Sequence, residues 1–325
     1  MLLLGIAVSA LFLWLASRSV DLDLFWESLK SCEYIWLVPA LFGIAVAVVI
    51  RAWRWQLLFA PGRRPPLPAL TRALLVGQLF NAVLPMRAGE AARIVVLHQE
   101  TGTSRAETLG TAVVERIYDV LTLLLLLIVT APFMPEVEWL DRAAWLAAAF
   151  LVLTIAGAFV VARFGPRPIR VLFAPLAILP VLTRHHTDAA AERLVQGLAA
   201  LHRVRLVVPA LVLSVVSWLV LAFSNWLVLV AFDLGLGYSA GILILVTTTL
   251  SLVIPAAPGG VGVFEAGGVI ALRAYGVDDS TALSVTVVLH ALNILPFVVV
   301  GTVLLHRHAL RIGDLQRAAA NRNLT

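Results

Sequence analysis

The sequence predicts an all-α polytopic membrane protein, because the chain is very apolar and its apolar runs have the length of membrane-spanning helices. Of its 325 residues, 61% are hydrophobic and 13% are charged, whereas soluble domains carry about 25% charged residues. The mean hydropathy is +0.97. A helix needs roughly 20 apolar residues to cross a hydrocarbon core of about 30 Å. We therefore predict one integral-membrane domain, residues 1–325, with about six full spans and two re-entrant, broken-helix hairpins.

The first apolar run, MLLLGIAVSALFLWLAS, has no basic residue ahead of it, so we interpret it as a retained span and not as a cleaved signal peptide. Five more apolar runs have the length of complete spans. Two further apolar regions contain proline, glycine and charged residues, and they do not fit a straight span. The spans are predicted at 1–17, 34–50, 109–131, 143–162, 207–231 and 281–305, and the broken regions at 70–97 and 241–274.

Arginine in the connecting segments predicts the orientation, since basic loops stay in the cytoplasm. The segment after the second span, the polar segment 163–206 and the C-terminal tail are rich in arginine, whereas the connections at 21–33 and 136–141 are acidic. Both termini are therefore predicted to be cytoplasmic, in the inner (plasma) membrane of the cell. Within the polar segment, residues 187–205 have the pattern of an amphipathic helix that lies on the inner leaflet.

This orientation constrains the two broken regions. Region 70–97 must begin and end on the cytoplasmic side, and region 241–274 must begin and end on the outer side. Irregular backbone at membrane depth is tolerated only where protein or a water-filled cavity surrounds it. Two non-spanning hairpins that dip in from opposite sides satisfy this condition. Complete two-helix hairpins that turn at proline and glycine would also begin and end on the same side of the membrane, and they remain an alternative.

The two broken regions also share a local pattern. A glycine follows a proline by four residues in PMRAG, from Pro85 to Gly89, and in PAAPG, from Pro255 to Gly259. Because the two regions are also predicted to enter the membrane from opposite sides, the pattern indicates an inverted repeat in which discontinuous helices meet near the midplane. The repeat halves are predicted at about 34–162 and 207–305.

Net charge and cysteine count exclude several classes of function. The formal net charge is +5, but the basic residues are scattered over loops, which indicates anionic lipid headgroups and not nucleic acid as partners. The single cysteine, Cys32, excludes a disulfide framework or a thiolate metal cluster within the chain. The histidine pairs lack cysteine partners, so no metal and no other cofactor is expected. These pairs are His185/His186 and His306/His308.

The run TAVVERIYDVLTLL places charges inside a predicted span, where each costs at least about 2.5 kcal/mol at the helix centre. Glu115 and Asp119 are four residues apart and share a helical face, and Arg116 precedes Asp119 by three. We predict an Arg116–Asp119 pair that leaves Glu115 unpaired near headgroup depth. The alternative is a structural ion network that fixes this helix to the first hairpin.

The first broken region supplies Arg87, Glu90 and Arg93. The planar guanidinium of arginine suits phosphate, and we predict a lipid phosphate bound between Arg87, Arg93 and Arg116. Alternatively, Arg87 and Arg93 extend to the cytoplasmic interface and pair with Glu90. The backbone positions predicted to form the break are Asn81, Pro85 and Gly89.

The second broken region combines a rigid residue with flexible ones. Pro258 fixes the backbone, while glycine allows conformations closed to other residues. Amides there, or the start of the following helix, are predicted to hold an anionic headgroup. Glu265, the only acid at this depth, is assigned to a cationic headgroup or a proton, with a helix-start glutamate favoured by the dipole as the alternative. The backbone positions are Pro255, Pro258, Gly259, Gly260 and Gly262.

Two further groups of polar residues lie in or beside spans. His290 and Asn293 are three residues apart in the last span, and we assign them either to the same cavity or to hydrogen bonds between helices. A Trp/Arg cluster at the cytoplasmic end of the second span is interpreted as an interfacial anchor. Its members are Arg51, Trp53, Arg54 and Trp55.

Three of these stretches together resemble a known family. FNAVLPMRAGEAARIVVL, GTAVVERIYDVLTLLLL and SLVIPAAPGGVGVFEAGGV are similar to the lysylphosphatidylglycerol synthetase transmembrane-region family, over about residues 51–307. That family includes the flippase half of bacterial multiple-peptide-resistance-factor proteins and free-standing YbhN-like membrane proteins. The resemblance implies a lipid-translocating domain with re-entrant segments. The two-domain members carry a soluble aminoacyltransferase after the membrane part, and since none follows here, lysyl transfer is not expected.

The sequence therefore predicts a flippase or transporter that moves an anionic phospholipid or a polyprenyl-phosphate-linked lipid between leaflets. No activated nucleophile, metal triad or nucleotide cradle is recognisable, so an enzyme is not expected. Two alternatives remain open: a non-transporting partner or scaffold of an envelope-lipid biosynthetic enzyme, and an integral-membrane lipid-modifying transferase with the Glu115/Asp119 pair as its base. The lipid, the driving force and the oligomeric state are left open by the sequence.

Overall fold

The computed structural model describes residues 2–17, 20–84, 88–164, 204–254 and 256–322. This part of the chain forms eleven α-helices and no strand, which confirms the all-α prediction. Three short 3-10 turns lie between helices: η1 (Tyr34–Trp36), η3 (Ala131–Phe133) and η6 (Pro258–Gly260). The helices are α1 (Leu2–Ser17), α2 (Leu22–Ser31), α3 (Leu37–Leu58), α4 (Leu67–Val83), α5 (Gly89–Thr101), α6 (Arg105–Thr130), α7 (Glu138–Phe164), α10 (Val204–Ala231), α11 (Tyr238–Ser251), α12 (Val263–Ala274) and α13 (Asp279–Arg322).

Three helical segments in the described part of the chain are long and apolar enough to cross a membrane. They are Tyr34–Leu58, Val208–Ala231 and Asp279–His306. They overlap three of the six predicted spans, although the first extends eight residues beyond its predicted end at 50. Large apolar side chains on them face outward, such as Phe42, 71% exposed, and Val299, 63% exposed. Outward-facing apolar surface of this kind is what a helix presents to lipid. The chain is therefore a membrane protein.

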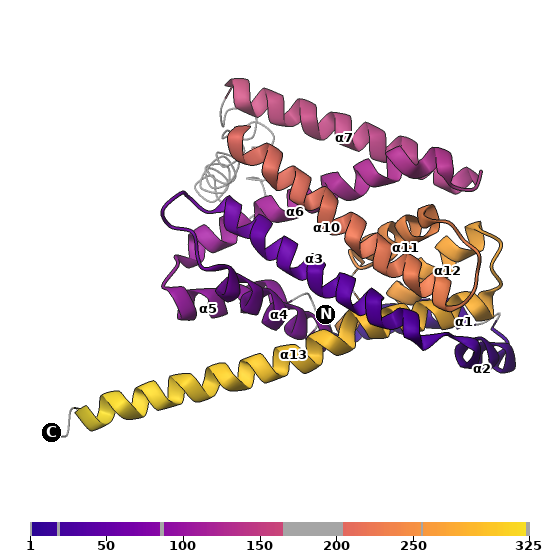
Figure 1. Cartoon of the computed structure of the whole chain (residues 1–325). Helices are drawn as coiled ribbons and strands as arrows, with labels where there is room; N and C mark the ends of the chain where they lie inside the picture. Colours follow the sequence, from indigo (N-terminus) through magenta and orange to yellow (C-terminus); the bar gives the residue numbers. More distant parts are fainter. Residues whose placement is uncertain (1, 18–19, 85–87, 165–203, 255, 323–325) are drawn as a thin grey trace.

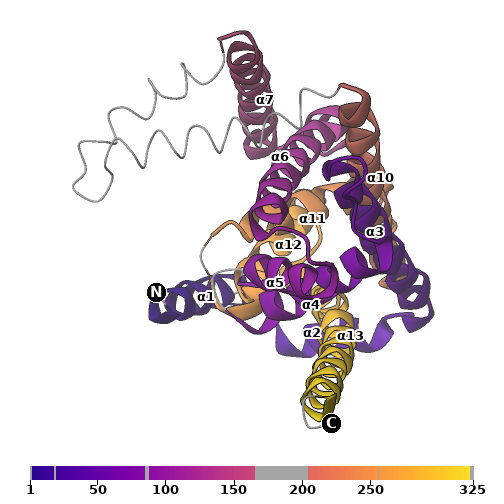
Figure 2. The same cartoon turned by 90° about the vertical axis from the view of Figure 1, so that its left-hand side faces the viewer.

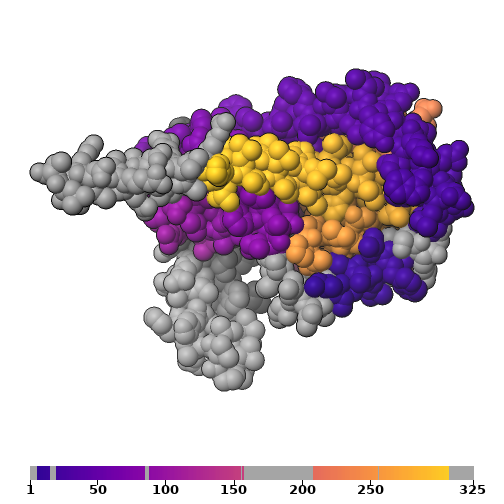
Figure 3. Space-filling model, turned by 90° about the horizontal axis from the view of Figure 1, so that it is seen from below, coloured from indigo at the N-terminus to yellow at the C-terminus, as the bar shows by residue number. Residues whose placement is uncertain are grey.

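The other three predicted spans form α1, α6 and α7 but stay predictions. Helix α1 has 16 residues, fewer than the roughly 20 that a straight crossing needs. Helix α6 is long enough, but its apolar stretch contains Glu115, Arg116 and Asp119. The prediction for the last span is incomplete, because α13 continues as a helix to Arg322 where a tail was expected. Figure 3 shows the described part of α13, in yellow, along one face of the molecule.

The two broken regions each form a pair of short helices. Helices α4 and α5 have 17 and 13 residues, and α11 and α12 have 14 and 12. At 1.5 Å per residue these helices measure about 18 to 26 Å, less than the bilayer core. The α4–α5 pair lies at the end of the molecule from which α13 extends, and the α11–α12 pair lies toward the other end (Figure 1). Viewed from the α5 end, the two pairs overlap in the middle of the bundle (Figure 2).

Glycines allow close helix contacts, as is common where membrane helices pack. A Cβ on Gly89 would lie 1.9 Å from the carbonyl oxygen of Gly77, so α5 begins in direct backbone contact with α4. The Asn81 side chain accepts a hydrogen bond from the Gly89 amide at 2.9 Å and caps the start of α5. Pro85, like Arg87, lies outside the described residues. The first break is therefore fixed by Asn81 and by two glycines that touch.

The second break is made by glycines in left-handed conformations. Gly259, Gly260 and Gly262 have φ of +72°, +76° and +89°, which non-glycine residues seldom adopt. A Cβ on Gly262 would lie 2.3 Å from the carbonyl oxygen of Ser9 in α1. Pro258 opens the 3-10 turn η6, Pro258–Gly260, and Pro255 lies outside the described residues. The chain thus turns between α11 and α12 in contact with α1.

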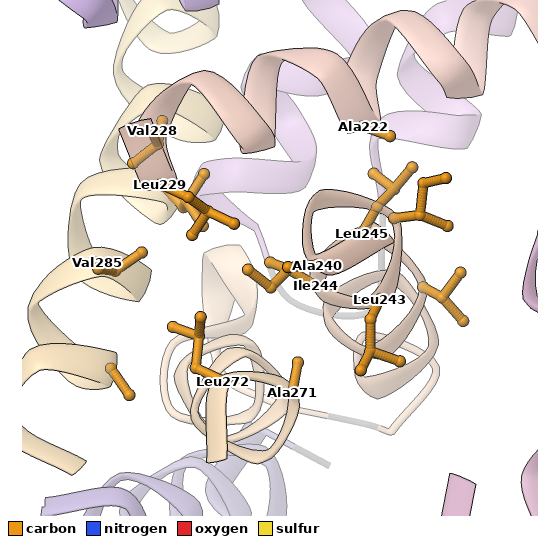
Figure 4. Packing of buried hydrophobic residues seen from close by; sticks show 14 of the residues in the cluster. Ala222, Val228, Leu229, Ala240, Leu243, Ile244, Leu245, Ala271, Leu272 and Val285 are labelled. Carbon is orange, nitrogen blue, oxygen red and sulfur yellow. The ribbon is translucent and has the colours of Figure 1, made fainter. Parts of the chain in front are cut away.

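The main apolar core lies between α10, α11, α12 and α13 (Figure 4). Leu243 and Ile244 of α11 and Leu272 of α12 are completely buried there. Helix α11 approaches α10 closely, because a Cβ on Gly241 would lie 2.6 Å from the Ala222 carbonyl oxygen. This core packs the second helix pair against two long helices.

Residues 22–31 form a helix that the sequence analysis did not predict. Asp21 caps α2 by accepting hydrogen bonds from the amides of Asp23 and Leu24. The helix is held on α13 by hydroxyl contacts, among them Ser28 with Thr281 at 3.0 Å. Trp26 on its other face is 55% exposed. The acidic connection at 21–33 is thus an ordered amphipathic helix.

Candidate functional site

A group of charged side chains lies buried where α3, α5, α6 and α10 meet. We refer to it as the arginine–carboxylate cluster. Burial of so many charges in an apolar protein is costly unless each is paired and hydrogen-bonded. The cluster consists of Arg51 and Arg54 of α3, Glu90 and Arg93 of α5, and Glu115, Arg116 and Asp119 of α6.

Arg54 is the central residue of the cluster and is fully buried. One terminal nitrogen donates to Glu115 at 2.9 Å, and the other donates to Asp119 at 2.6 Å. The latter nitrogen also donates to the Ser214 hydroxyl of α10 at 2.8 Å. The planar guanidinium has donors that diverge at fixed angles, so it can bridge two carboxylates one helical turn apart. Arg54 therefore joins α3, α6 and α10.

Arg93 makes the corresponding link to α5. Its guanidinium pairs with Glu115 at 2.7 Å and with Glu90 at 2.6 Å. It also lies over the Trp55 ring, 4.8 Å from the centroid, a cation–π contact. Both Arg93 and Glu115 are 3% exposed. The first helix pair is thus tied to α6 by a buried ion pair.

Arg116 lies at the edge of the cluster, with 48% of its side chain exposed. It pairs with Glu90, and one of its nitrogens lies 3.6 Å from Asp119. Asp119 also accepts a hydrogen bond from the indole N–H of Trp218 at 3.2 Å. Through Arg116 the cluster reaches the surface of the protein.

Arg51 is the cluster arginine that makes no ion pair with a described carboxylate. Its Nε and one terminal nitrogen are buried and have no hydrogen-bond partner among the described residues. Its guanidinium lies 4.3 Å from the centre of the Trp218 ring. Four arginines face three carboxylates in the cluster, so one positive charge is uncompensated by the described side chains. Arg54 and Arg93 also have buried nitrogens without a hydrogen-bond partner among the described residues, but each of them is ion-paired with a carboxylate.

A second polar centre lies beside the break between α11 and α12. The two oxygens of the Glu265 carboxylate accept from the Gly262 amide at 2.6 Å and contact Nδ1 of His290 at 2.5 Å. The other ring nitrogen of His290 lies 2.9 Å from the Gly259 carbonyl oxygen. The ring stacks on Phe264, with centroids 4.3 Å apart. Glu265 is thus a helix-start residue, as the alternative interpretation had it, and is also paired with His290.

Two predictions about the charged residues are wrong. Arg54 and Trp55 are not interfacial anchors, because both are fully buried; of that group, Trp53 is exposed. Glu115 is not left unpaired, because both Arg54 and Arg93 pair with it. Sequence spacing within one helix identified Arg116 as the partner of Asp119, but the closer partner comes from a helix 65 residues earlier in the chain.

Other predicted residues are placed as follows. Arg93 and Arg116 both lie in the cluster, but each pairs with a carboxylate, while Arg87 is outside the described residues. His290 bonds to other segments, whereas the Asn293 amide donates to the carbonyl of Leu289 in its own helix. His185, His186 and most of segment 163–206 also lie outside the described residues.

Sequence reasoning missed Ser214, Trp218, the burial of Arg54 and the buried nitrogens of Arg51. Ser214 and Trp218 are ordinary members of an apolar span and carry no local signal. Arg51 and Arg54 do carry one, because they are three residues apart and share a helical face. That face is also the face of α3 that packs on α10, where Gly43 touches Ser224. A helix face shared by a small residue and two arginines indicates buried charge.

We expect Trp218→Phe to destabilise the protein by about 1.5 kcal/mol, because a hydrogen bond to a charged acceptor is lost while the ring stays. Thermal unfolding in detergent, followed by near-UV circular dichroism, measures the change. Trp53→Phe is the matched control, since Trp53 is exposed, and it should change stability by less than about 0.5 kcal/mol. Equal effects of the two substitutions would contradict a role for the indole N–H.

Comparison with known proteins agrees with the motifs. A comparison with curated proteins finds no significant match. A family model described as the lysylphosphatidylglycerol synthase TM region matches residues 2–301. The match contains all four helices of the arginine–carboxylate cluster and both helix pairs. It confirms the family that the three sequence stretches resemble. The chain belongs to the family of lysylphosphatidylglycerol synthase transmembrane regions.

Proposed function

We propose that this protein is a lipid translocator that moves a lipid with an anionic, phosphate-containing headgroup between membrane leaflets. The observation that carries the proposal is the excess of one arginine in the arginine–carboxylate cluster, with donors of Arg51 unsatisfied. A charged headgroup loses its water when it leaves the interface, and fixed donors have to replace that water. Membership in a family named for a lipid synthase supports a lipid as the substrate.

The charge balance of the cluster is suited to reversible binding of a phosphate group. A site of balanced ion pairs has no net attraction for an anion, whereas one uncompensated guanidinium attracts it without binding irreversibly. Arg116 is half-exposed and lies at the edge of the cluster, so a headgroup contacts it first. Arg51 lies inside, against Trp218. We assign the phosphate to these two arginines, and the structural ion pairs to Arg54 and Arg93.

The two helix pairs are the moving parts in this proposal. We interpret them as re-entrant hairpins of an inverted repeat, with both termini in the cytoplasm and the protein in the plasma membrane. Their short helices and their positions toward opposite ends of the molecule support this interpretation. The hairpins touch, because a Cβ on Gly259 would lie 3.3 Å from the carbonyl oxygen of Ala82 in α4. Separation of this contact opens a route between them.

The test is leaflet exchange in liposomes that contain the purified protein. Headgroup-labelled phosphatidylglycerol and polyprenyl phosphate are followed by their accessibility to dithionite. Arg51→Gln should slow exchange about tenfold or more, since a charge-assisted contact to phosphate is worth about 1.5–3 kcal/mol. Its melting temperature should not fall, because the replaced guanidinium has unsatisfied donors.

Arg72→Gln is the matched control. It also removes one arginine, but Arg72 pairs with Glu100 at 2.7 Å outside the cluster. Exchange by this variant should equal that of the wild type. If Arg51→Gln and Arg72→Gln behave alike, the phosphate is not bound at Arg51. Absence of exchange for every lipid tested with folded wild-type protein favours a scaffold for a separate lipid enzyme instead.

A further inference from the structure

The geometry of the second polar centre, formed by Glu265 and His290, shows how many hydrogen atoms its contacts need. Both ring nitrogens of His290 face acceptors: a Glu265 oxygen at 2.5 Å and the Gly259 carbonyl oxygen at 2.9 Å. A carbonyl oxygen only accepts, so Nε2 has to carry a hydrogen. The other Glu265 oxygen accepts from the Gly262 amide. The short contact between Glu265 and Nδ1 therefore needs one more proton, located on either atom.

We propose that the Glu265–His290 pair is a proton-binding site, and that translocation is coupled to one proton bound there. This proposal rests on the function proposed above. With the proton, the pair has two equivalent forms, carboxylate with imidazolium or carboxylic acid with neutral imidazole, and both satisfy all three contacts. Without it, neutral imidazole has a single N–H and faces two acceptors. One of its two contacts then becomes repulsive, lone pair against lone pair.

The proton-dependent contact holds the break in place. His290 belongs to α13, while Gly259 and Glu265 belong to the turn η6 and to α12. The bond from His290 to Gly259 therefore attaches the turn to α13. Gly259 is also the residue that touches Ala82 of the first helix pair. Loss of the proton weakens the attachment of the turn at the contact between the two hairpins.

The surroundings leave this pair as the proton acceptor. Helices α12 and α13, which carry the pair, are packed by α1, α2, α4, α10 and α11, and both residues are 6% exposed or less. Helix α2 carries Asp23, Glu27 and Lys30 but contacts α13 at Thr281, about 13 Å before His290 along the helix, and the described side chains of α10 contain no ionisable group. The described side chains of α1 contain no ionisable group. Those of the other helices are engaged elsewhere or distant: Arg72 pairs with Glu100, Tyr238 donates to Leu219, Arg273 pairs with Asp279, and His306 lies about 24 Å further along α13.

The step balances as one proton taken up and one released. Water on one side of the membrane supplies the proton to the pair when the turn seats against α13 and α4. When the turn leaves, the proton passes to water on the side then accessible. No redox partner and no covalent step are required. The phosphate site adjoins the first helix pair through the Arg116–Glu90 ion pair. The phosphate site and this proton site are thus linked by one moving contact, Gly259 with Ala82.

The first experiment measures thermal stability of the purified full chain between about pH 5 and about pH 9, the range that includes histidine titration. The seated turn contains the proton, so the melting temperature of the wild type should fall as pH rises. Glu265→Gln should keep the low-pH melting temperature throughout, because its amide N–H donates to Nδ1 and its oxygen accepts from Gly262. His290→Gln should melt lower at low pH and lack the slope.

His98→Gln is the control, because His98 lies in α5 and contacts the Thr103 carbonyl; it should retain the wild-type slope. A Glu265→Gln slope equal to that of the wild type overturns the proposal, and this comparison suffices even where His290→Gln does not fold. In liposomes with an imposed pH gradient, wild-type exchange should change about tenfold, and exchange by Glu265→Gln should not respond.

The two proposals fail separately. A proton-dependent melting temperature that Glu265→Gln abolishes, without lipid exchange by the wild type, keeps the proton site and overturns translocation. Lipid exchange by a wild type whose melting temperature has the same pH dependence as Glu265→Gln keeps translocation and overturns the proton site.

Discussion

Arg54→Gln is expected to leave little folded protein, because it removes the one side chain that neutralises two buried carboxylates from the same position. Glu115 and Asp119 are 3% and 6% exposed, and both pair with Arg54. Removal of one partner from a buried ion pair costs about 3–5 kcal/mol, since the remaining charge stays buried. Here two charges lose that partner, although Arg93 still pairs with Glu115. Asp119 is the more affected, as Arg116 lies 3.6 Å away.

Thermal unfolding in detergent and the yield of monodisperse protein measure this effect. Arg54→Lys should fall between the wild type and Arg54→Gln, because an ammonium keeps the charge but cannot bridge two carboxylates as a planar fork does. Arg72→Gln provides the surface reference, for which a loss of at most about 1 kcal/mol is expected. If Arg54→Gln is as stable as Arg72→Gln, the cluster does not hold the fold together.

Gly89→Ala should be the second severe substitution, although it adds only one methyl group. The new Cβ would lie 1.9 Å from the Gly77 carbonyl oxygen and 2.5 Å from the Asn81 side-chain oxygen. The first is a backbone atom, so α4 and α5 must separate for the methyl group to fit. Forced overpacking of this kind costs about 3 kcal/mol. Separation would also break the Asn81 cap of α5 and shift Arg93 away from Glu115.

The matched control is Gly110→Ala in α6, where an added Cβ meets no atom within 4 Å. That substitution should be neutral, or stabilising by up to about 1 kcal/mol, because alanine favours helix. Limited proteolysis of the α4–α5 connection and thermal unfolding report the difference between the two variants. Similar stability of both would mean that the close contact at Gly77 is relaxed in the native protein.

Much of the helix pattern could be predicted from the sequence. Apolar runs of span length predicted the starts of α3, α10 and α13 to within three residues, because hydrocarbon thickness sets the length of an apolar helix. Helix α3 continues eight residues beyond its predicted end at 50, to Leu58. Proline and glycine marked both breaks. By contrast, α2 was missed, since its ten residues carry three charges and resemble a loop. Its helical state depends on hydroxyl contacts with α13, which is more than 250 residues away.

The sequence predicted only those residues of the candidate site that stand out within one helix or one hairpin. Glu90, Arg93, Glu115, Arg116 and Asp119 stood out because charge inside apolar sequence is costly. Spacing within one helix predicted the Arg116–Asp119 pair, which forms at 3.6 Å. It could not predict that Arg54, from another helix, is the closer partner of Asp119. The same limit applied at Glu265, whose contact with His290 spans 25 residues.

The sequence by itself determined that this chain is an all-helical membrane protein of this family, with two broken helix pairs and charges inside the membrane region. Those properties follow from local terms: apolar length, backbone conformations open to glycine, and the cost of burying charge. Only the tertiary structure decided that Arg54 is a buried bridge, that Arg51 is the cluster arginine without a partner among the described carboxylates, and that His290 lies between two acceptors. These roles depend on how helices from distant parts of the chain rotate and approach one another, and that is set by packing over the whole bundle.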